Sequence, residues 1–381
     1  MNYDFPMINT IDDVLPAIDG RDEFIVFERE NLKGIDYKVS FADTFPPISD
    51  VNTALRRECR GLLFHTDGKI AARRFHKFFN VNEREETQSN MIDLSKKHIV
   101  LEKLDGSMVS PIVVNGRIIW TTMMGESDVA KMVYPVVKDS YDKFVMDMVD
   151  AGYTPIFEFY NGKNRIVVRY ESAYLILTGL RHTISGEYVW YDAMVDIAGD
   201  YGIPVVKSYG SISDMGQFID DVRGQQNVEG RIIYFVDGHR VKIKCDWYVM
   251  LHKAKEAITY EKDVWDIVLN NNIDDVLPVL DKDDSSHLME FSDAFHSRLI
   301  ALERDMHDMF DKMNEENTER KEFARHAFSL PDEWQRTLMM NHYTGKRTIK
   351  DTLHRMVQMG TRSATYVDEV ANQLKLPRWN R

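Results

Sequence analysis

Glycine is distributed unevenly along this chain, and its distribution limits what each part can fold into. Of the 20 glycines in 381 residues, 18 precede residue 250, and only Gly345 and Gly360 follow it. Glycine is favoured in tight turns and weakens the interior of a helix. The sequence therefore predicts a turn-rich domain over residues 1–250 and an all-α domain over residues 251–381.

Short apolar or alternating runs, separated by turn residues, fill the first of these domains. Examples are EFIVF, IVVNGRIIW and GRIIYFVDGHRVKIK. The pairs Asn115-Gly116 and Asp237-Gly238 each lie between two such runs, which is typical of a β-hairpin turn. We expect an α+β fold with antiparallel sheets and helices in this part.

A helical stripe lies in the second domain. Its six apolar residues recur at spacings of three or four, as on one face of a helix. They are Phe295, Leu299, Leu302, Met306, Phe310 and Met313. Ser292 is the expected N-cap of this helix. A Met-rich stripe of this kind is typical of helix packing rather than of a functional site.

The net charge of −13 argues against a protein that binds nucleic acid through its overall charge. Any phosphate must therefore be bound by a local group of basic residues. Cys59 and Cys245 are far apart in the sequence, which excludes a disulfide scaffold or a cysteine-based zinc site and favours a reducing compartment. The N-terminus has neither a basic n-region nor a long apolar run, so we expect a cytoplasmic protein with no membrane partner.

Several motifs of common active sites are missing. The sequence contains no Gly-x-x-x-x-Gly-Lys-Ser/Thr phosphate loop, no dinucleotide fingerprint, no His-Glu-x-x-His and no serine nucleophile elbow. The 12 histidines show no metal-ligand spacing. Any catalytic site must use other residues.

The segment VLEKLDGSMVS, residues 100–110, leads an apolar strand into Lys103, Asp105 and Gly106. A lysine has an unperturbed pKa of about 10.4, so it is no nucleophile at neutral pH unless its neighbours disfavour the charged form. Arginine cannot replace it, because arginine does not lose its proton. Either Lys103 is an ordinary surface residue, or distant parts of the chain supply those neighbours.

Three strand-like runs carry charged residues that could do so. In VKIKCDWY, Lys242 and Lys244 project from the same face of a strand. Glu158 lies among large apolar residues in PIFEFY, and Glu229-Gly230 directly precedes RIIYF. Taken singly, these could be a solvated sheet face, a structural salt bridge and a turn. Together, the lysines could lower the pKa of a nearby lysine and neutralise a transferring phosphoryl group, and the glutamates could hold a divalent cation.

A fourth run is basic and ends in two aromatic residues, Phe78 and Phe79. Basic residues beside aromatic ones suit a phosphate and a stacked base, although such a run can also be a solvated face. The basic residues are Arg56, Arg57, Arg60, Lys69, Arg73, Arg74 and Lys77.

The order of these motifs resembles the covalent nucleotidyltransferase superfamily of ligases and mRNA capping enzymes. More specific are RECRGLLF, HKFFNVNE, EKLDGSMVS, FEFYNGKNRIVVRY, VEGRIIYF and VKIKCDWYVMLH. These segments resemble the bacteriophage RNA ligase family of the T-even type, the RNA ligase 1-like enzymes of tRNA repair. The resemblance covers most of residues 20–250 and extends more loosely through the helical C-terminal part.

This resemblance implies an ATP-grasp-like nucleotidyltransferase domain over residues 1–250. It also implies a helical domain over residues 251–381, with no OB-fold, that selects the RNA. Lys103 would attack the α-phosphate of ATP, AMP would pass to an RNA 5′-phosphate, and an RNA 3′-hydroxyl would displace the AMP. The cofactors would be ATP and Mg²⁺ or Mn²⁺. The partners would be RNA, such as a nicked tRNA, and an end-healing kinase-phosphatase in the host cytoplasm, with the ligase a monomer.

The resemblance also implies a role for each motif residue, with Lys103 as the nucleophile. The implied nucleotide-binding residues are Arg60, Lys77, Phe79, Glu102, Glu229, Lys242 and Lys244. The implied metal ligands are Glu158 and Glu229, with Asp274 and Asp275 at a second metal site. Further matching positions are Asp105, Gly106, Gly230 and Tyr248, the last with no assigned role.

One segment departs from the family pattern. TTMMGES, residues 121–127, has Met124 where the family commonly carries a lysine. One expected substrate or phosphate contact is therefore missing.

Three other interpretations remain open: a DNA ligase, a capping-type guanylyltransferase, and a non-catalytic RNA-binding module with the same fold. The first two normally follow the Lys-x-Lys strand with a β-rich OB-fold domain, and the near absence of glycine after residue 250 argues against one here. The complete set of charged motif residues argues against the third.

Overall fold

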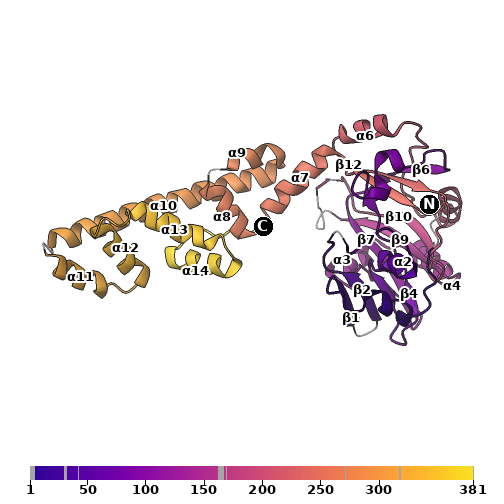
Figure 1. The fold of residues 1–381 in the computed structure, drawn as a ribbon, viewed down its shortest axis with the longest axis horizontal. Helices are drawn as coiled ribbons and strands as arrows, with labels where there is room; N and C mark the ends of the chain where they lie inside the picture. Colours follow the sequence, from indigo (N-terminus) through magenta and orange to yellow (C-terminus); the bar gives the residue numbers. More distant parts are fainter. Residues whose placement is uncertain are drawn as a thin grey trace. The chain divides into compact units, whose positions relative to one another are not determined.

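The computed structural model describes residues 5–29, 32–41, 43–161, 167–168, 170–270, 272–316 and 319–380. It divides into two compact units, Met1–Val249 and Met250–Arg381. The strands belong to the first unit, and the second is built from helices (Figure 1). The expected α+β fold with a helical C-terminal part is confirmed.

The described residues of the first unit form three four-stranded sheets. The first has the order β1 (Phe24–Arg29), β2 (Leu32–Tyr37), β3 (Leu62–Phe64) and β4 (Ile70–Ala72). The second has the order β10 (Tyr174–His182), β9 (Tyr153–Tyr160), β7 (Ser107–Val114) and β8 (Arg117–Thr121). The third has the order β5 (Phe79–Asn80), β12 (Arg240–Lys244), β11 (Gly230–Phe235) and β6 (His98–Lys103). Among the described strand pairs, β12 and β5 are parallel and the others are antiparallel.

Two hairpins form where the sequence predicts them. Asn115 and Gly116 join β7 to β8 with φ angles of 52° and 72°. Positive φ at both central residues is what a type I′ turn requires. Asp237 and Gly238 lie between β11 and β12, and Gly238 has a φ of 86°.

Helices pack against these sheets, among them α4 against β9 and α6 against β11 and β12. The α-helices are α1 (Leu15–Ile18), α2 (Val51–Glu58), α3 (Asp128–Lys131), α4 (Asp139–Asp150), α5 (Tyr191–Gly199) and α6 (Met215–Arg223). Short 3-10 turns occur at Ile11–Asp13, Glu85–Thr87, Ser89–Met91 and Tyr134–Val136. The Asp50 side chain caps α2 by accepting a hydrogen bond from Thr53 N at 2.8 Å.

Side chains of β9 point alternately to its two faces, as the sequence predicts. Phe157 and Phe159 are fully buried and pack with Trp120 and Phe144 in one apolar core. Because successive side chains of a strand point to opposite faces, Glu158 points away from this core.

Strand β12 alternates in the same way. Val241 and Ile243 are buried in a core that includes residues of α6. Lys242 and Lys244 project from the opposite face and are partly exposed. The apolar cores of β9 and β12 thus aim charged side chains away from themselves.

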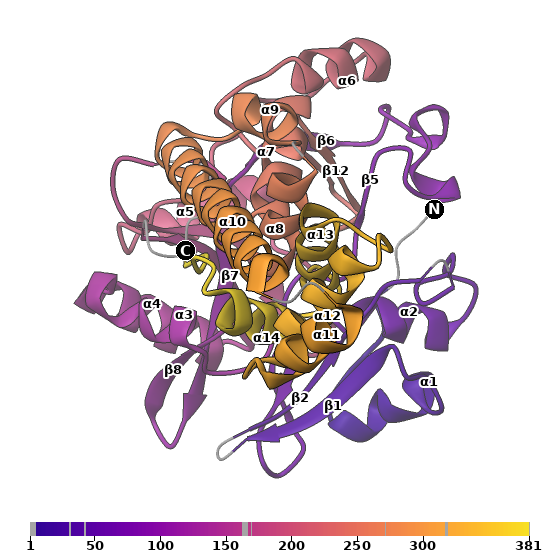
Figure 2. The same ribbon diagram turned by 90° about the vertical axis from the view of Figure 1, so that its left-hand side faces the viewer.

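Helices account for all regular structure among the described residues of the second unit, so no OB-fold is present there (Figure 2). They are α8 (Glu261–Leu269), α9 (Ile273–Val276), α10 (Lys282–Glu316), α11 (Arg320–Ser329), α12 (Glu333–Tyr343), α13 (Ile349–Gly360) and α14 (Ala364–Leu374), with a 3-10 turn at Leu277–Val279. Helix α7 (Asp246–Ala257) contains the boundary between the two units. None of the described helices could cross a lipid bilayer.

The predicted stripe lies on α10, but this helix begins earlier than expected. The buried stripe residues are Phe295, Leu302, Met306 and Met313. The prediction that Ser292 caps the helix is wrong, because Ser292 is a buried residue in the helix interior. The helix begins at Lys282, and Asp281 Oδ1 accepts a hydrogen bond from Asp284 N at 3.0 Å. Asp281 thus satisfies one of the first N–H groups of the helix, whereas Ser292 lies inside the helix, where no N-cap is required.

Candidate active site

Lys103 lies at the end of β6, where three strands bring distant motifs together. The register pairs Lys103 with Gly230 of β11, and Gly230 with Lys244 of β12. Gly230 has a φ of 154°, and a Cβ there would overlap the carbonyl oxygen of Ile243. Only glycine lets the strands approach this closely. The Lys-x-Asp-Gly, Glu-Gly and Lys-x-Lys motifs therefore meet in one row across the third sheet.

A buried carboxylate joins the two lysines of this row. Glu229 Oε1 lies 2.6 Å from Lys103 Nζ and 3.2 Å from Lys244 Nζ. The Glu229 side chain is 5% exposed, whereas those of Lys103 and Lys244 are 19% and 30% exposed. An ammonium group has no lone pair, so a proton must leave Nζ before Lys103 can attack. Glu229 lies within hydrogen-bonding distance to receive it.

Lys242 adds a third lysine to the same face of the sheet. Burial lowers the pKa of Lys242 to about 7. The positive charges of Lys103, Arg60 and Lys77 contribute to this shift, in that order. The Lys242 Nζ also lies 5.5 Å from the centre of the Phe78 ring. Cations from several segments thus converge on one partly buried space, which suits a polyanionic ligand.

Glu158 is the second candidate carboxylate of the site. Burial raises the pKa of Glu158 to about 8, the charge of Lys103 opposes this shift, and the charge of Glu229 adds to it. A divalent cation bound beside Glu158 would favour its ionised form. The described part of the chain contains no group of three or more His, Cys, Asp or Glu side chains arranged to hold a metal. Glu158 and Glu229 could hold one together with phosphate and water oxygens, as Mg²⁺ prefers.

Asp105 supports the loop that follows Lys103 through its own hydrogen bonds. Its side chain is 1% exposed, and Oδ1 accepts a hydrogen bond from Tyr248 OH at 2.8 Å. Oδ2 accepts from the backbone N–H groups of Val167 and Val168 at 2.7 and 2.6 Å. This arrangement fixes the loop after Lys103 and gives Tyr248, whose role the sequence left open, a structural partner.

Gly106 is required by a close approach of two backbones. A Cβ at Gly106 would lie 2.6 Å from the carbonyl oxygen of Phe159 and 3.2 Å from Glu158 Cγ. Glycine at this position brings the loop that follows Lys103 against β9, beside Glu158.

Lys77 lies among aromatic side chains that sequence analysis did not single out. Its Nζ donates a hydrogen bond to Tyr37 OH at 3.1 Å and lies 4.5 Å and 5.3 Å from the ring centres of Tyr37 and Phe45. The negative face of an aromatic ring attracts such a cation. Tyr37 ends β2, and the only signal for it was the apolar-polar alternation of LKGIDY.

Arg60 lies beside a second residue that the sequence did not reveal. Burial raises the pKa of Asp36, and a backbone hydrogen bond from Tyr37 and the charge of Arg60 oppose this shift. The Arg60 guanidinium also lies 3.5 Å from Phe75 O and 3.4 Å from Met108 Sδ. These contacts hold Arg60 just before the first residue of β3.

With this geometry established, the sequence can be compared with known proteins. The family described as RNA ligase matches residues 58–248. The chain belongs to this RNA ligase family. A "Putative RNA ligase" from Thermovibrio ammonificans is 30% identical, and the match covers 81% of this chain and 82% of that protein. The RNA ligase of Rhodothermus phage RM378 is 24% identical, covering 68% of this chain and 73% of that protein.

The predicted family is therefore confirmed, and the chain is an RNA ligase. Among solved structures, an archaeal ATP-dependent RNA ligase (form 1) is 13% identical with a TM-score of 0.48, over 95% of this chain and 85% of that chain. We draw nothing further from a similarity at this level.

Two of the residues expected to contact the nucleotide are Phe79, which is buried, and Glu102, which lies on the opposite face of the sheet from Lys103. Phe79 is 1% exposed, and its ring lies 4.7 Å from the Arg57 guanidinium and 4.9 Å from that of Arg84. It therefore supports the site from within the core. Glu102 pairs with Arg231 in the register and, as the neighbour of Lys103 on a strand, projects from the opposite face of the sheet.

The segment that departs from the family pattern lies beside Arg60. A Cβ at Gly61 would lie 2.8 Å from Met123 Cα, so the two backbones are in contact. Met124 follows directly and is 36% exposed. Met124, where the resemblance led us to expect a lysine, is therefore one residue from a backbone contact with Gly61, the neighbour of Arg60.

The second expected metal site lies in the other unit. Asp274 and Asp275 are in the first turn of α9. They do not form part of any group of three metal-binding side chains among the described residues. A metal role for this pair stays a prediction.

Proposed function

We propose that this ligase uses ATP and joins RNA 5′-phosphate and 3′-hydroxyl ends through a lysine–AMP intermediate on Lys103. The observation that carries the proposal is the row of Lys103, Gly230 and Lys244, with Glu229 Oε1 2.6 Å from Lys103 Nζ. In this row a carboxylate, Glu229, is in direct contact with both the nucleophile, Lys103, and a second cation, Lys244. Adenylylation of a lysine needs these three groups together.

In the first step Lys103 Nζ passes a proton to Glu229 and forms a bond to the α-phosphorus of ATP. The bond between that phosphorus and the oxygen bridging to the β-phosphate breaks, and pyrophosphate leaves with the electron pair. Lys242 and Lys244 stabilise the charge that develops on the α-phosphate. A bound Mg²⁺ or Mn²⁺ would neutralise phosphate charge, with Glu158 and Glu229 holding it directly or through water.

In the later steps AMP passes from Lys103 to the RNA 5′-phosphate, and an RNA 3′-hydroxyl attacks that phosphate and releases AMP. Arg60 and Lys77 bind phosphates during these transfers, since both lie near Lys242. Residues 1–250 form the adenylyltransferase domain, and residues 251–381 select the RNA. A nicked tRNA, prepared by an end-healing kinase-phosphatase, is the substrate class we propose, for a monomer acting in the cytoplasm.

Covalent labelling tests this proposal. Incubation with α-labelled ATP and Mg²⁺ should label the protein, and Lys103→Ala should abolish the label. Lys131→Ala is the control, because the Lys131 side chain is 60% exposed and lies on α3. Label from GTP alone would indicate a capping-type enzyme, and no label from either nucleotide would indicate a binding module.

The sealing step has its own test. The ligase should circularise a 5′-phosphorylated single-stranded RNA in the presence of ATP. Efficient sealing of nicked duplex DNA with no joining of RNA ends would contradict the proposed substrate.

A further inference from the structure

The segment between β4 and β5 contains buried residues and has no partner strand among the described residues. Arg73, Arg74 and His76 are each at most 1% exposed. Buried backbone groups need hydrogen-bond partners, and side chains supply two of them here. Thr154 Oγ1 accepts a hydrogen bond from Arg73 N at 3.0 Å, and Tyr188 OH accepts one from His76 N at 3.2 Å. The position of this segment therefore depends on side-chain contacts.

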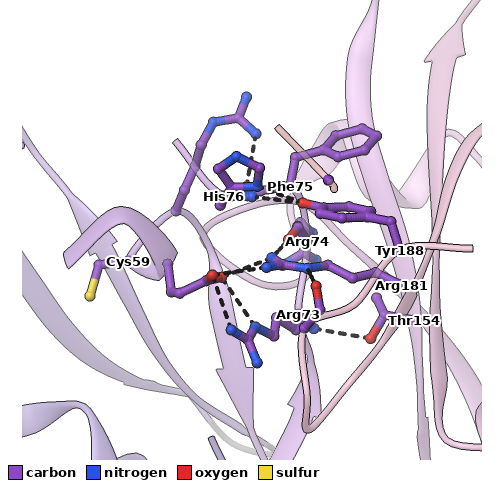
Figure 3. A network of polar contacts seen from close by, with 12 residues as sticks. Cys59, Arg73, Arg74, Phe75, His76, Thr154, Arg181 and Tyr188 are labelled. Atoms are coloured by element: carbon purple, nitrogen blue, oxygen red, sulfur yellow. Dashed lines mark hydrogen bonds and ion pairs between the residues drawn. The ribbon is translucent and has the colours of Figure 1, made fainter. Parts of the chain in front are cut away.

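One carboxylate fastens this segment to two other parts of the unit. Glu58, at the end of α2, accepts hydrogen bonds from Arg73 Nε at 3.1 Å and from both terminal nitrogens of Arg181 at 2.8 Å. The three side chains are at most 1% exposed. Burial would raise the pKa of Glu58, but the charges of Arg181 and Arg73 hold it below its ordinary value. In Figure 3 the Arg73 and Arg181 side chains both point toward α2, beside Cys59.

The remaining donors of the two arginines orient them further. Arg181 Nε donates to Gly186 O at 2.7 Å and its NH1 donates to Arg74 O at 2.5 Å. Arg73 NH1 donates to Ile184 O at 2.7 Å. A Cβ at Gly186 would overlap the Arg73 guanidinium, so glycine makes room for this arrangement. A lysine could not reproduce it, because an ammonium lacks the planar fork of donors.

Two cations of the candidate active site lie on the segments that Glu58 joins. Arg60 follows Glu58 closely in the chain, and its NH1 lies 3.5 Å from Phe75 O. Lys77 follows Phe75, and its backbone N donates to Arg57 O at 2.7 Å. A shift of the segment against α2 would therefore displace Arg60 and Lys77 relative to each other.

We propose that Glu58, Arg73 and Arg181 are positioning residues that hold Arg60 and Lys77 in place for the phosphates of the bound substrate. The proposal rests on the proposed function, and it assigns the basic residue Arg73 to support rather than to substrate contact. Burial of all three side chains leaves them without surface to offer a ligand. Misplacement of a binding group by about 1 Å can cost about 10²-fold in rate.

The test replaces Arg181 by lysine, which keeps the positive charge and loses the two-pronged contact with Glu58. We expect Arg181→Lys to raise the KM for ATP in lysine adenylylation by about tenfold or more, with a smaller change in kcat. Should Arg181→Lys fail to fold, Thr154→Val is the second variant. It removes the acceptor of Arg73 N, together with a hydrogen bond to Thr183 Oγ1, and should raise the KM in the same direction.

Leu180→Ala is the matched control. Leu180 precedes Arg181 on β10, is 1% exposed and packs into the core on the other face of the sheet. It should lower Tm without altering the contacts of Glu58, and its KM for ATP should equal that of the wild type. The proposal is overturned if Arg181→Lys leaves the KM unchanged, or if Leu180→Ala raises it equally.

A second measurement separates this proposal from the proposed function, because it needs no activity. Lys77 Nζ lies 4.5 Å from the centre of the Tyr37 ring, so its NMR signal in protein with ¹³C-methylated lysines should show a ring-current shift. The signal is assigned with Lys77→Arg. Absence of ATP labelling in the wild type would contradict the proposed function but not the positioning role. Loss of the Lys77 shift in Arg181→Lys, with its retention in Leu180→Ala, supports the positioning role, and an unchanged shift in Arg181→Lys refutes it.

Discussion

Two buried carboxylates of the first unit each bind two cations. The two clusters differ in the exposure of the cations and in the number of contacts that each carboxylate makes. Glu58 binds Arg73 and Arg181, whose side chains have no exposed surface, through contacts of 2.8 to 3.1 Å. Glu229 binds Lys103 and Lys244 through one oxygen, at 2.6 and 3.2 Å, and both lysines reach solvent.

The chemistry of the cations explains this difference. A guanidinium stays charged and presents a rigid fork of donors, so it holds a carboxylate in one geometry. An ammonium on a flexible stem can swing and can lose its proton. The Glu58 cluster is therefore suited to fix a segment, and the Glu229 cluster to rearrange when a substrate arrives.

The largest expected difference between the two clusters is the loss of stability when the carboxylate of each is removed. Glu58→Ala removes the carboxylate that both buried guanidinium groups face, so we expect it to lower the free energy of unfolding by about 3–5 kcal/mol. Glu229→Ala leaves two lysines that can turn to water, so the loss should be about 1 kcal/mol or less. Urea unfolding measures both, and similar losses would contradict the contrast drawn between the clusters.

A third carboxylate, Glu158, extends the contrast to pH. Its pKa is raised from 4.5 to about 8, so between these pH values the folded protein holds a proton that the unfolded chain releases. The resulting stability is present below pH 4.5 and is lost as pH rises toward 8, by up to about 1.4 kcal/mol per pH unit. Glu58, whose pKa is lowered, acts in the opposite sense, since its contribution is lost as pH falls.

Glu158→Gln should remove the loss of stability that the titration of Glu158 causes as pH rises. Its free energy of unfolding, measured in chelator from pH 5 to 8, should decline less steeply than that of the wild type. Parallel curves for the two proteins would show that Glu158 titrates normally.

The smallest expected effect concerns Asp105, a buried carboxylate held by neutral donors. Tyr248→Phe removes the hydrogen bond from Tyr248 OH to Asp105 Oδ1 and should cost about 1 kcal/mol of stability, while also slowing lysine adenylylation. Tyr201→Phe is the control, because Tyr201 OH donates to Asp147 Oδ2 at 2.7 Å, on helix α4. Equal labelling rates in the two variants would show that the Asp105 contact does not support the proposed nucleophile, Lys103.

The sequence predicted site residues where these residues belong to short motifs that follow a fixed order. Lys103, Glu229 and Lys244 could be proposed as neighbours because each lies at the end of an apolar run, and the structure places them in one row. Tyr37 could not be found in this way, because its contact with Lys77 joins residues 40 positions apart without a motif. The cap at Ser292 was misjudged because the sequence pattern shows the face of a helix more clearly than its first residue.

The sequence alone determined the α+β and all-α division, the hairpins and the order of charged motifs, because glycine placement and side-chain periodicity act locally. Only the tertiary structure showed that residues of the basic run 56–77 have different surroundings. Arg73 is withdrawn into a buried contact with Glu58, whereas Lys77 lies against Tyr37 near the lysines of the site. Burial and pairing depend on which distant strands meet, so the charge of a residue in the sequence does not reveal whether it binds a substrate or supports the residues that do.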